Sequence, residues 1–111
     1  MITAEFYLQE EKLIGFSVRG HAGFADFGRD IACASVTSAV EMAANGITEI
    51  LKIPAAVELF ENEVKLLLSQ SGKEPGESSR EGFAFIQALR LHLELLAREF
   101  PENIRIIDLE V

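Results

Sequence analysis

Apolar and polar residues alternate in the first part of the chain. In residues 2–8, Ile2, Ala4, Phe6 and Leu8 fall on one side, and residues 13–19 alternate again after the polar stretch 9–12. A period of two is typical of a half-buried β-strand. The two segments therefore predict an antiparallel hairpin joined by a short polar turn.

Two later segments have helical spacing instead. Apolar residues recur every three or four positions from Ile31 to Leu51, and Pro54 predicts that this helix ends near residues 52–54. A second helix is predicted to end at Pro101, with an apolar stripe made of Phe83, Ile86, Leu89, Leu93, Leu96 and Phe100. Three further apolar residues widen this stripe beyond what one sheet face requires, which indicates contact with another subunit: Phe85, Leu91 and Leu95.

Between the helices, residues 56–60 and 64–69 flank a polar turn and predict a second hairpin. Its expected buried positions are Val57, Leu59, Val64, Leu66 and Leu68. Residues 104–111 predict a last strand. The resulting order, ββαββαβ, favours an α+β fold in which a mostly antiparallel sheet carries two helices packed on one face. A length of 111 residues fits a single domain spanning 1–111.

Composition narrows the possible partners. The chain has 18 acidic and 10 basic residues and a formal net charge of −8. Direct nucleic-acid binding is disfavoured because phosphates are bound mainly by Lys and Arg, whereas a basic protein would be attracted. No apolar run is long enough to cross a membrane. A lone cysteine and an N-terminus without a secretory pattern lead us to expect the cytoplasm.

Candidate chemistry concentrates between the first hairpin and the first helix. Residues 20–33 contain the only cysteine, Cys33, and one of the two histidines, His21. Residues 20–28 are expected to form a flexible loop with three glycines, Gly20, Gly23 and Gly28. A thiolate is the nucleophilic form of cysteine, and a neighbouring imidazole can accept its proton. The pair therefore predicts a nucleophile with its base, although a buried cysteine that only fills the core is the alternative.

The helix is expected to begin after Asp30, which places Cys33 in its first turn. The unpaired amides and the helix dipole would there favour an anion and hold the oxyanion of a tetrahedral intermediate. Asp30 itself has two alternative roles, either capping the helix or orienting the ring of His21 as the third member of a triad. Asp26 is a weaker candidate for the orienting role.

Other kinds of site are less well supported. A metal site is not expected, because zinc needs three or four converging ligands and the chain offers few. The glycines lack the spacing of a phosphate-binding loop. His92 falls within the second helix and is expected to be an exposed or interfacial residue.

The segments Gly20-His21-Ala22 and Asp30-Ile31-Ala32-Cys33-Ala34 together resemble the Prp family of ribosomal-processing cysteine proteases. The resemblance extends over essentially the whole chain. It implies that His21 is the catalytic histidine and Cys33 the nucleophile, with Asp30 at an acidic position near the site. Thr37 stands where the family often has a serine, four residues after the cysteine, which makes it a candidate secondary site residue.

The resemblance also implies a homodimeric cytoplasmic enzyme without a cofactor. Such proteases remove an N-terminal extension from the bacterial large-subunit ribosomal protein numbered twenty-seven. The alternative is a non-enzymatic ribosome-associated binding module that retains the fold.

Overall fold

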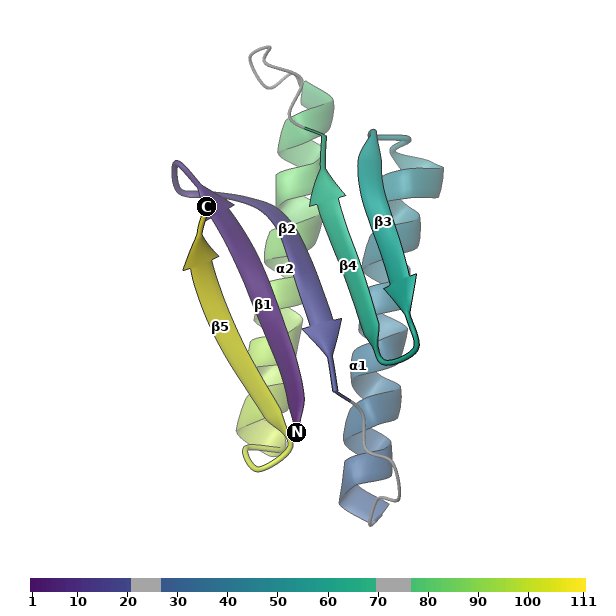
Figure 1. The fold of residues 1–111 in the computed structure, drawn as a ribbon, viewed down its shortest axis with the longest axis vertical. Helices are drawn as coiled ribbons and strands as arrows, with labels where there is room; N and C mark the ends of the chain where they lie inside the picture. The colour runs from purple at the N-terminus through teal and green to yellow at the C-terminus, as the bar shows by residue number, and fades with distance from the viewer. Residues whose placement is uncertain (21–26, 70–76) are drawn as a thin grey trace.

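A computed structural model describes residues 1–20, 27–69 and 77–111, with residues 27–30 and 77–79 described by their backbone alone. Figure 1 shows a five-stranded sheet with both helices on one face. The strand order is β3-β4-β2-β1-β5. Three neighbouring pairs are antiparallel, and β5 runs parallel to β1. The predicted α+β class, its mostly antiparallel sheet and the order ββαββαβ are confirmed.

The first hairpin forms as the alternation predicts. Strand β1 (Ile2–Gln9) pairs with β2 (Lys12–Arg19), leaving Glu10 and Glu11 in the turn. Both turn residues have positive φ, 50° and 66°, as the two central positions of a type I′ hairpin turn require. The second hairpin joins β3 (Ala55–Phe60) to β4 (Glu63–Leu68).

The first helix starts earlier than its apolar pattern indicates. Helix α1 spans Phe27–Asn45 and continues into one π-helical turn, η1 (Gly46–Ile50). Helix α2 (Glu77–Glu99) then leads to β5 (Ile104–Glu110) and supplies the crossover that a parallel strand needs. Within the described ranges, neither helix is long and apolar enough to span a membrane.

The core lies between the sheet and the two helices. Phe6 and Phe16 are fully buried on neighbouring strands, with ring centroids 6.4 Å apart. Side chains from both helical regions and from β4 complete this layer: Ile47, Leu66, Ile86 and Leu93. At Gly46 the ring of Phe85 occupies the space that a Cβ atom would need, so the absence of a side chain lets η1 approach α2.

Two expected core positions are wrong. Val57 is 41% exposed and Leu59 is 75% exposed, although Leu66 and Leu68 of the same hairpin are buried as predicted. The reason is that β3 is an edge strand with little packing against either helix. An alternating pattern identifies one face of a strand but does not indicate whether another element covers it.

Candidate active site

Cys33 lies in α1 beside the end of the sheet where β2 stops. It is the seventh residue of the helix and is partly buried. In Figure 1 the first part of α1 extends beyond the ends of the strands, on the side of the β3–β4 turn. Cys33 lines a cavity together with residues from the start of β1, the end of β2 and the β3–β4 turn, so four segments meet there.

The observed start of α1 corrects three expectations. Because the helix begins at Phe27, Asp30 is its fourth residue and is not the N-cap, and Gly28 belongs to the helix and not to a loop. Cys33 follows almost two full turns from the start, beyond the four amides that lack intrahelical partners. The expectation that first-turn amides at Cys33 stabilise a thiolate or an oxyanion is therefore wrong. These predictions failed for two reasons. Asp30 has the short side-chain acceptor that is typical of an N-cap residue, and the glycine at position 28 is disfavoured in a helix interior.

A cavity of about 140 Å³ opens beside Cys33. Thr37 and Glu41 follow at successive intervals of four residues, the spacing of one helix face, and both also line the cavity. The sheet and the second hairpin form the other walls: Ile2, Val18, Arg19, Gly20, Phe60, Glu61, Asn62, Glu63 and Val64. Three of the site residues predicted from sequence, Gly20, Cys33 and Thr37, thus line one cavity, and Gly20 directly follows β2.

Gly20 has a conformation that few other residues adopt. Its φ is +82°, and a Cβ atom there would overlap the carbonyl oxygen of Met1. Its amide donates a hydrogen bond of 3.1 Å to the carbonyl of Asn62 in the β3–β4 turn. The end of β2 is thereby held against both neighbouring segments. The next residue, His21, lies outside the described residues, as do Gly23 and Asp26.

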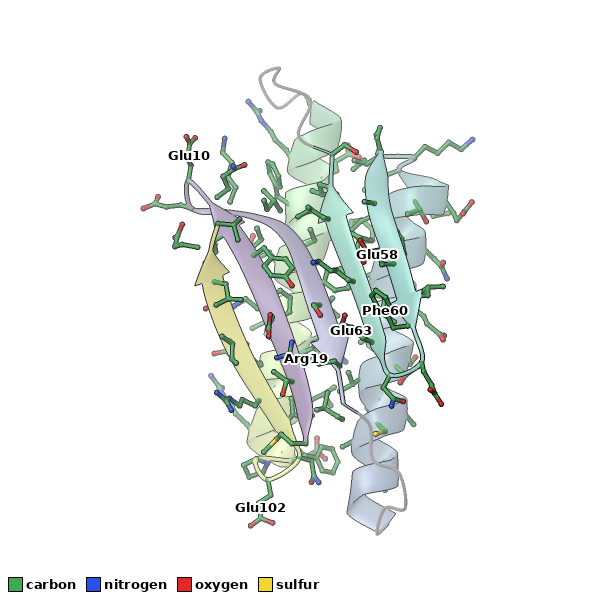
Figure 2. All side chains as sticks on the ribbon, in the orientation of Figure 1. Glu10, Arg19, Glu58, Phe60, Glu63 and Glu102 are labelled. Atoms are coloured by element: carbon green, nitrogen blue, oxygen red, sulfur yellow. The ribbon has the colours of Figure 1, made fainter. Side chains whose placement is uncertain are left out.

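Among the described residues, the charged side chains around the cavity are mainly negative. Arg19 is the one basic residue in this described part of the lining, and it forms an ion pair with Glu5 of β1. Figure 2 shows Arg19 and Glu63 on the sheet face that the helices leave open, where the two are register partners. Glu41 and Glu61 are exposed, and neither forms an ion pair within the part of the chain that the structure describes.

Sequence reasoning did not include the second hairpin in the site. The turn at 60–63 reaches the cavity because β4 pairs with β2, with Val64 opposite Val18. This pairing joins segments separated by a whole helix, and no local pattern indicates it. Glu41 could have been predicted as a site residue, because it lies eight residues after Cys33 on the same face of the predicted helix.

The other histidine of the chain, His92, is exposed on α2, as expected, and does not line the cavity. Among the residues with described positions, no group of three or more His, Cys, Asp or Glu side chains is arranged to hold a metal ion.

Comparisons with known proteins agree with this architecture. A family model described as "Cysteine protease Prp" matches residues 1–105. A curated relative, the ribosomal processing cysteine protease Prp of Bacillus subtilis (strain 168), is 25% identical over 107 residues, which are 96% of each chain.

Two solved structures share the fold. The ribosomal processing protease Prp of S. aureus in complex with a substrate peptide has a TM-score of 0.84 and 20% identity, and the match covers 98% of this chain and 100% of that one. SMU.848 from Streptococcus mutans has a TM-score of 0.82 and 21% identity, with 100% of this chain and 96% of that one covered.

Proposed function

Because the chain belongs to the Prp family of cysteine proteases, we propose that it removes the N-terminal extension of a bacterial large-subunit ribosomal protein, the one numbered twenty-seven. The observation that carries this proposal is the position of Cys33 on the wall of a cavity beside the end of β2. Gly20 follows that strand end, and His21 is the next residue in the sequence. The curated relative's name, a ribosomal processing protease, supports the substrate class.

The proposed reaction is acyl transfer through Cys33. Its thiolate attacks the scissile carbonyl carbon, and His21, having taken the thiol proton, protonates the departing amine. Water then attacks the thioester with His21 as base and releases the extension as a carboxylic acid. Asp30 retains the orienting role toward His21, three residues before Cys33 in α1, and the hydroxyl of Thr37 lines the cavity one helical turn later.

The proposed assembly is a cytoplasmic homodimer that acts on protein and does not bind nucleic acid directly. Leu91 and Leu95 support a dimer surface on α2, because they are 56% and 49% exposed and lie four residues apart on one helix face. The net charge of −8 supports attraction to a basic ribosomal protein.

The test is cleavage of the extended ribosomal protein by purified wild type, Cys33→Ala and His21→Ala. Wild type is expected to remove the extension, as measured by the intact mass and the N-terminal sequence of the product. Both variants should remain folded, as measured by circular dichroism, and their rate of cleavage should fall at least about a hundred-fold. Losses of this size are typical of residues that act in the transition state.

Unimpaired cleavage by Cys33→Ala would contradict the proposal. If wild type binds the extended protein without cutting it, and both variants bind equally well, a binding module that retains the fold would replace the protease assignment.

A further inference from the structure

The cavity beside Cys33 has aliphatic walls. The sheet contributes Ile2, Val18 and Val64, and α1 contributes Val36 and Val40. Its volume of about 140 Å³ is well below the roughly 300–1,000 Å³ of small-molecule sites. The cavity is therefore of a size to take one side chain of a bound peptide, and its walls favour a chain of methylene groups.

Carboxylates reach this cavity from three different elements. Glu41 comes from α1, Glu61 from the β3–β4 turn, and Glu63 from the start of β4, where it is the register partner of Arg19. Arg19, the one basic side chain in the described part of the lining, is already paired with Glu5. The charge next to the aliphatic walls is thus negative and is not neutralised by any ion pair among the described residues.

We propose that this cavity binds a lysine or arginine side chain of the peptide substrate close to the bond that is cut. Such a side chain combines an apolar stem with a charged end, so its methylenes would contact Val36, Val40 and Val64 while its cation lies between Glu41 and Glu61. The inference rests on the proposed function and deepens it. The net negative charge of the protein would attract basic residues anywhere in the substrate, whereas this cavity would select a basic residue next to Cys33.

The test compares two peptides that span the extension boundary of the ribosomal protein. One carries a lysine beside the boundary, and the other carries acetyl-lysine at the same position, which removes the charge and keeps the stem. Wild type is expected to cleave the first with a KM about three- to ten-fold lower, as two exposed charge pairs would produce. In Glu41→Gln/Glu61→Gln the two KM values should become nearly equal, with kcat changed little.

A matched control carries Glu10→Gln/Glu58→Gln. It loses the same two charges from exposed positions outside the cavity lining (Figure 2), so it should keep the full preference for the lysine peptide. An equal loss of preference in the control and in the cavity variant would overturn the proposal, and so would equal cleavage of both peptides by wild type.

A binding measurement separates this proposal from the proposed function. Fluorescence anisotropy with the same labelled peptides, in a Cys33→Ala background, gives a Kd for each. If wild type cleaves neither peptide, the protease substrate is wrong. A Kd preference for the lysine peptide that Glu41→Gln/Glu61→Gln abolishes would still support the cavity assignment, and its absence would refute that assignment.

Discussion

At the scale of single residues, Gly20 has the clearest link between local geometry and the proposed chemistry. Its positive φ and its contact with the carbonyl of Met1 leave no room for a side chain. The residue directly precedes His21, so its backbone sets the direction in which the chain leaves β2. A change at Gly20 should therefore affect the site without removing any reacting group.

We expect Gly20→Ala to lower the free energy of unfolding by about 1–3 kcal/mol, because an L-residue is disfavoured at positive φ and the added methyl overlaps backbone. Cleavage should slow by at least about ten-fold even at temperatures where the variant is fully folded. Urea unfolding and the rate of product formation measure the two effects.

Gly82→Ala is a matched control for this substitution. Gly82 lies in α2, and its Cβ would meet only side-chain atoms, the nearest being Cδ1 of Ile53 at 3.0 Å. A gain in helix propensity of about 1 kcal/mol would offset the tight contact, so both stability and cleavage should change little. A Gly20→Ala variant with the stability and rate of Gly82→Ala would contradict the role given to Gly20.

The residue types of the candidate site could be predicted from sequence, because a lone cysteine and a histidine flank a glycine-containing segment. The other residues that line the cavity could not be predicted in this way. Glu61 reaches the cavity through the pairing of β4 with β2, which depends on contacts distant in sequence. The roles of His21 and Cys33 stay predictions.

At the scale of elements, alternation and helical spacing predicted every strand and both long helices. The main error was the start of α1, where the pattern of apolar residues begins later than the helix itself. Gly28 costs only about 1 kcal/mol relative to alanine in a helix, so a glycine does not exclude helix at that position. The exposure of Leu59 has a different origin, since the edge position of β3 is decided by the whole sheet.

One ion pair connects the second helix to the last strand and provides a pH-dependent test of that packing. Arg90 on α2 donates two hydrogen bonds to the carboxylate of Asp108 on β5, at 2.9 and 2.6 Å. These bonds lower the pKa of Asp108 below its ordinary value of 3.8. A lowered pKa means that the folded state favours the ionised carboxylate, so the pair stabilises the fold above about pH 4 and loses this effect as the pH falls further.

We therefore expect Asp108→Asn to have a lower free energy of unfolding than wild type at pH 7, with a gap that narrows as the pH is lowered from 4 to 3. The gap should be at most about 1 kcal/mol because both side chains are partly exposed. Urea unfolding at the two pH values measures it. Glu102→Gln is the control, since Glu102 is exposed (Figure 2) and forms no ion pair among the described residues; a gap for Asp108→Asn that is constant with pH would contradict the assignment.

At the scale of the whole molecule, the topology explains why the site lies where it does. Placing both helices on one face leaves the other sheet face open and brings the first part of α1 past the ends of the strands (Figure 1). The ends of β1 and β2 and the second hairpin then meet Cys33 around one cavity. The fold class followed from the order of elements, whereas the strand order β3-β4-β2-β1-β5 required the structure.

The proposed mechanism requires Cys33 to form a covalent acyl intermediate with the substrate. Wild type mixed with the extended ribosomal protein and quenched in acid within milliseconds to seconds should gain the mass of the released extension less one water, because a thioester forms as the amine leaves. Fragmentation by tandem mass spectrometry should locate this mass on Cys33, and Cys33→Ala should not acquire it. Cleavage that proceeds with no such adduct, or with the adduct on another residue, would contradict the role of Cys33 as the nucleophile.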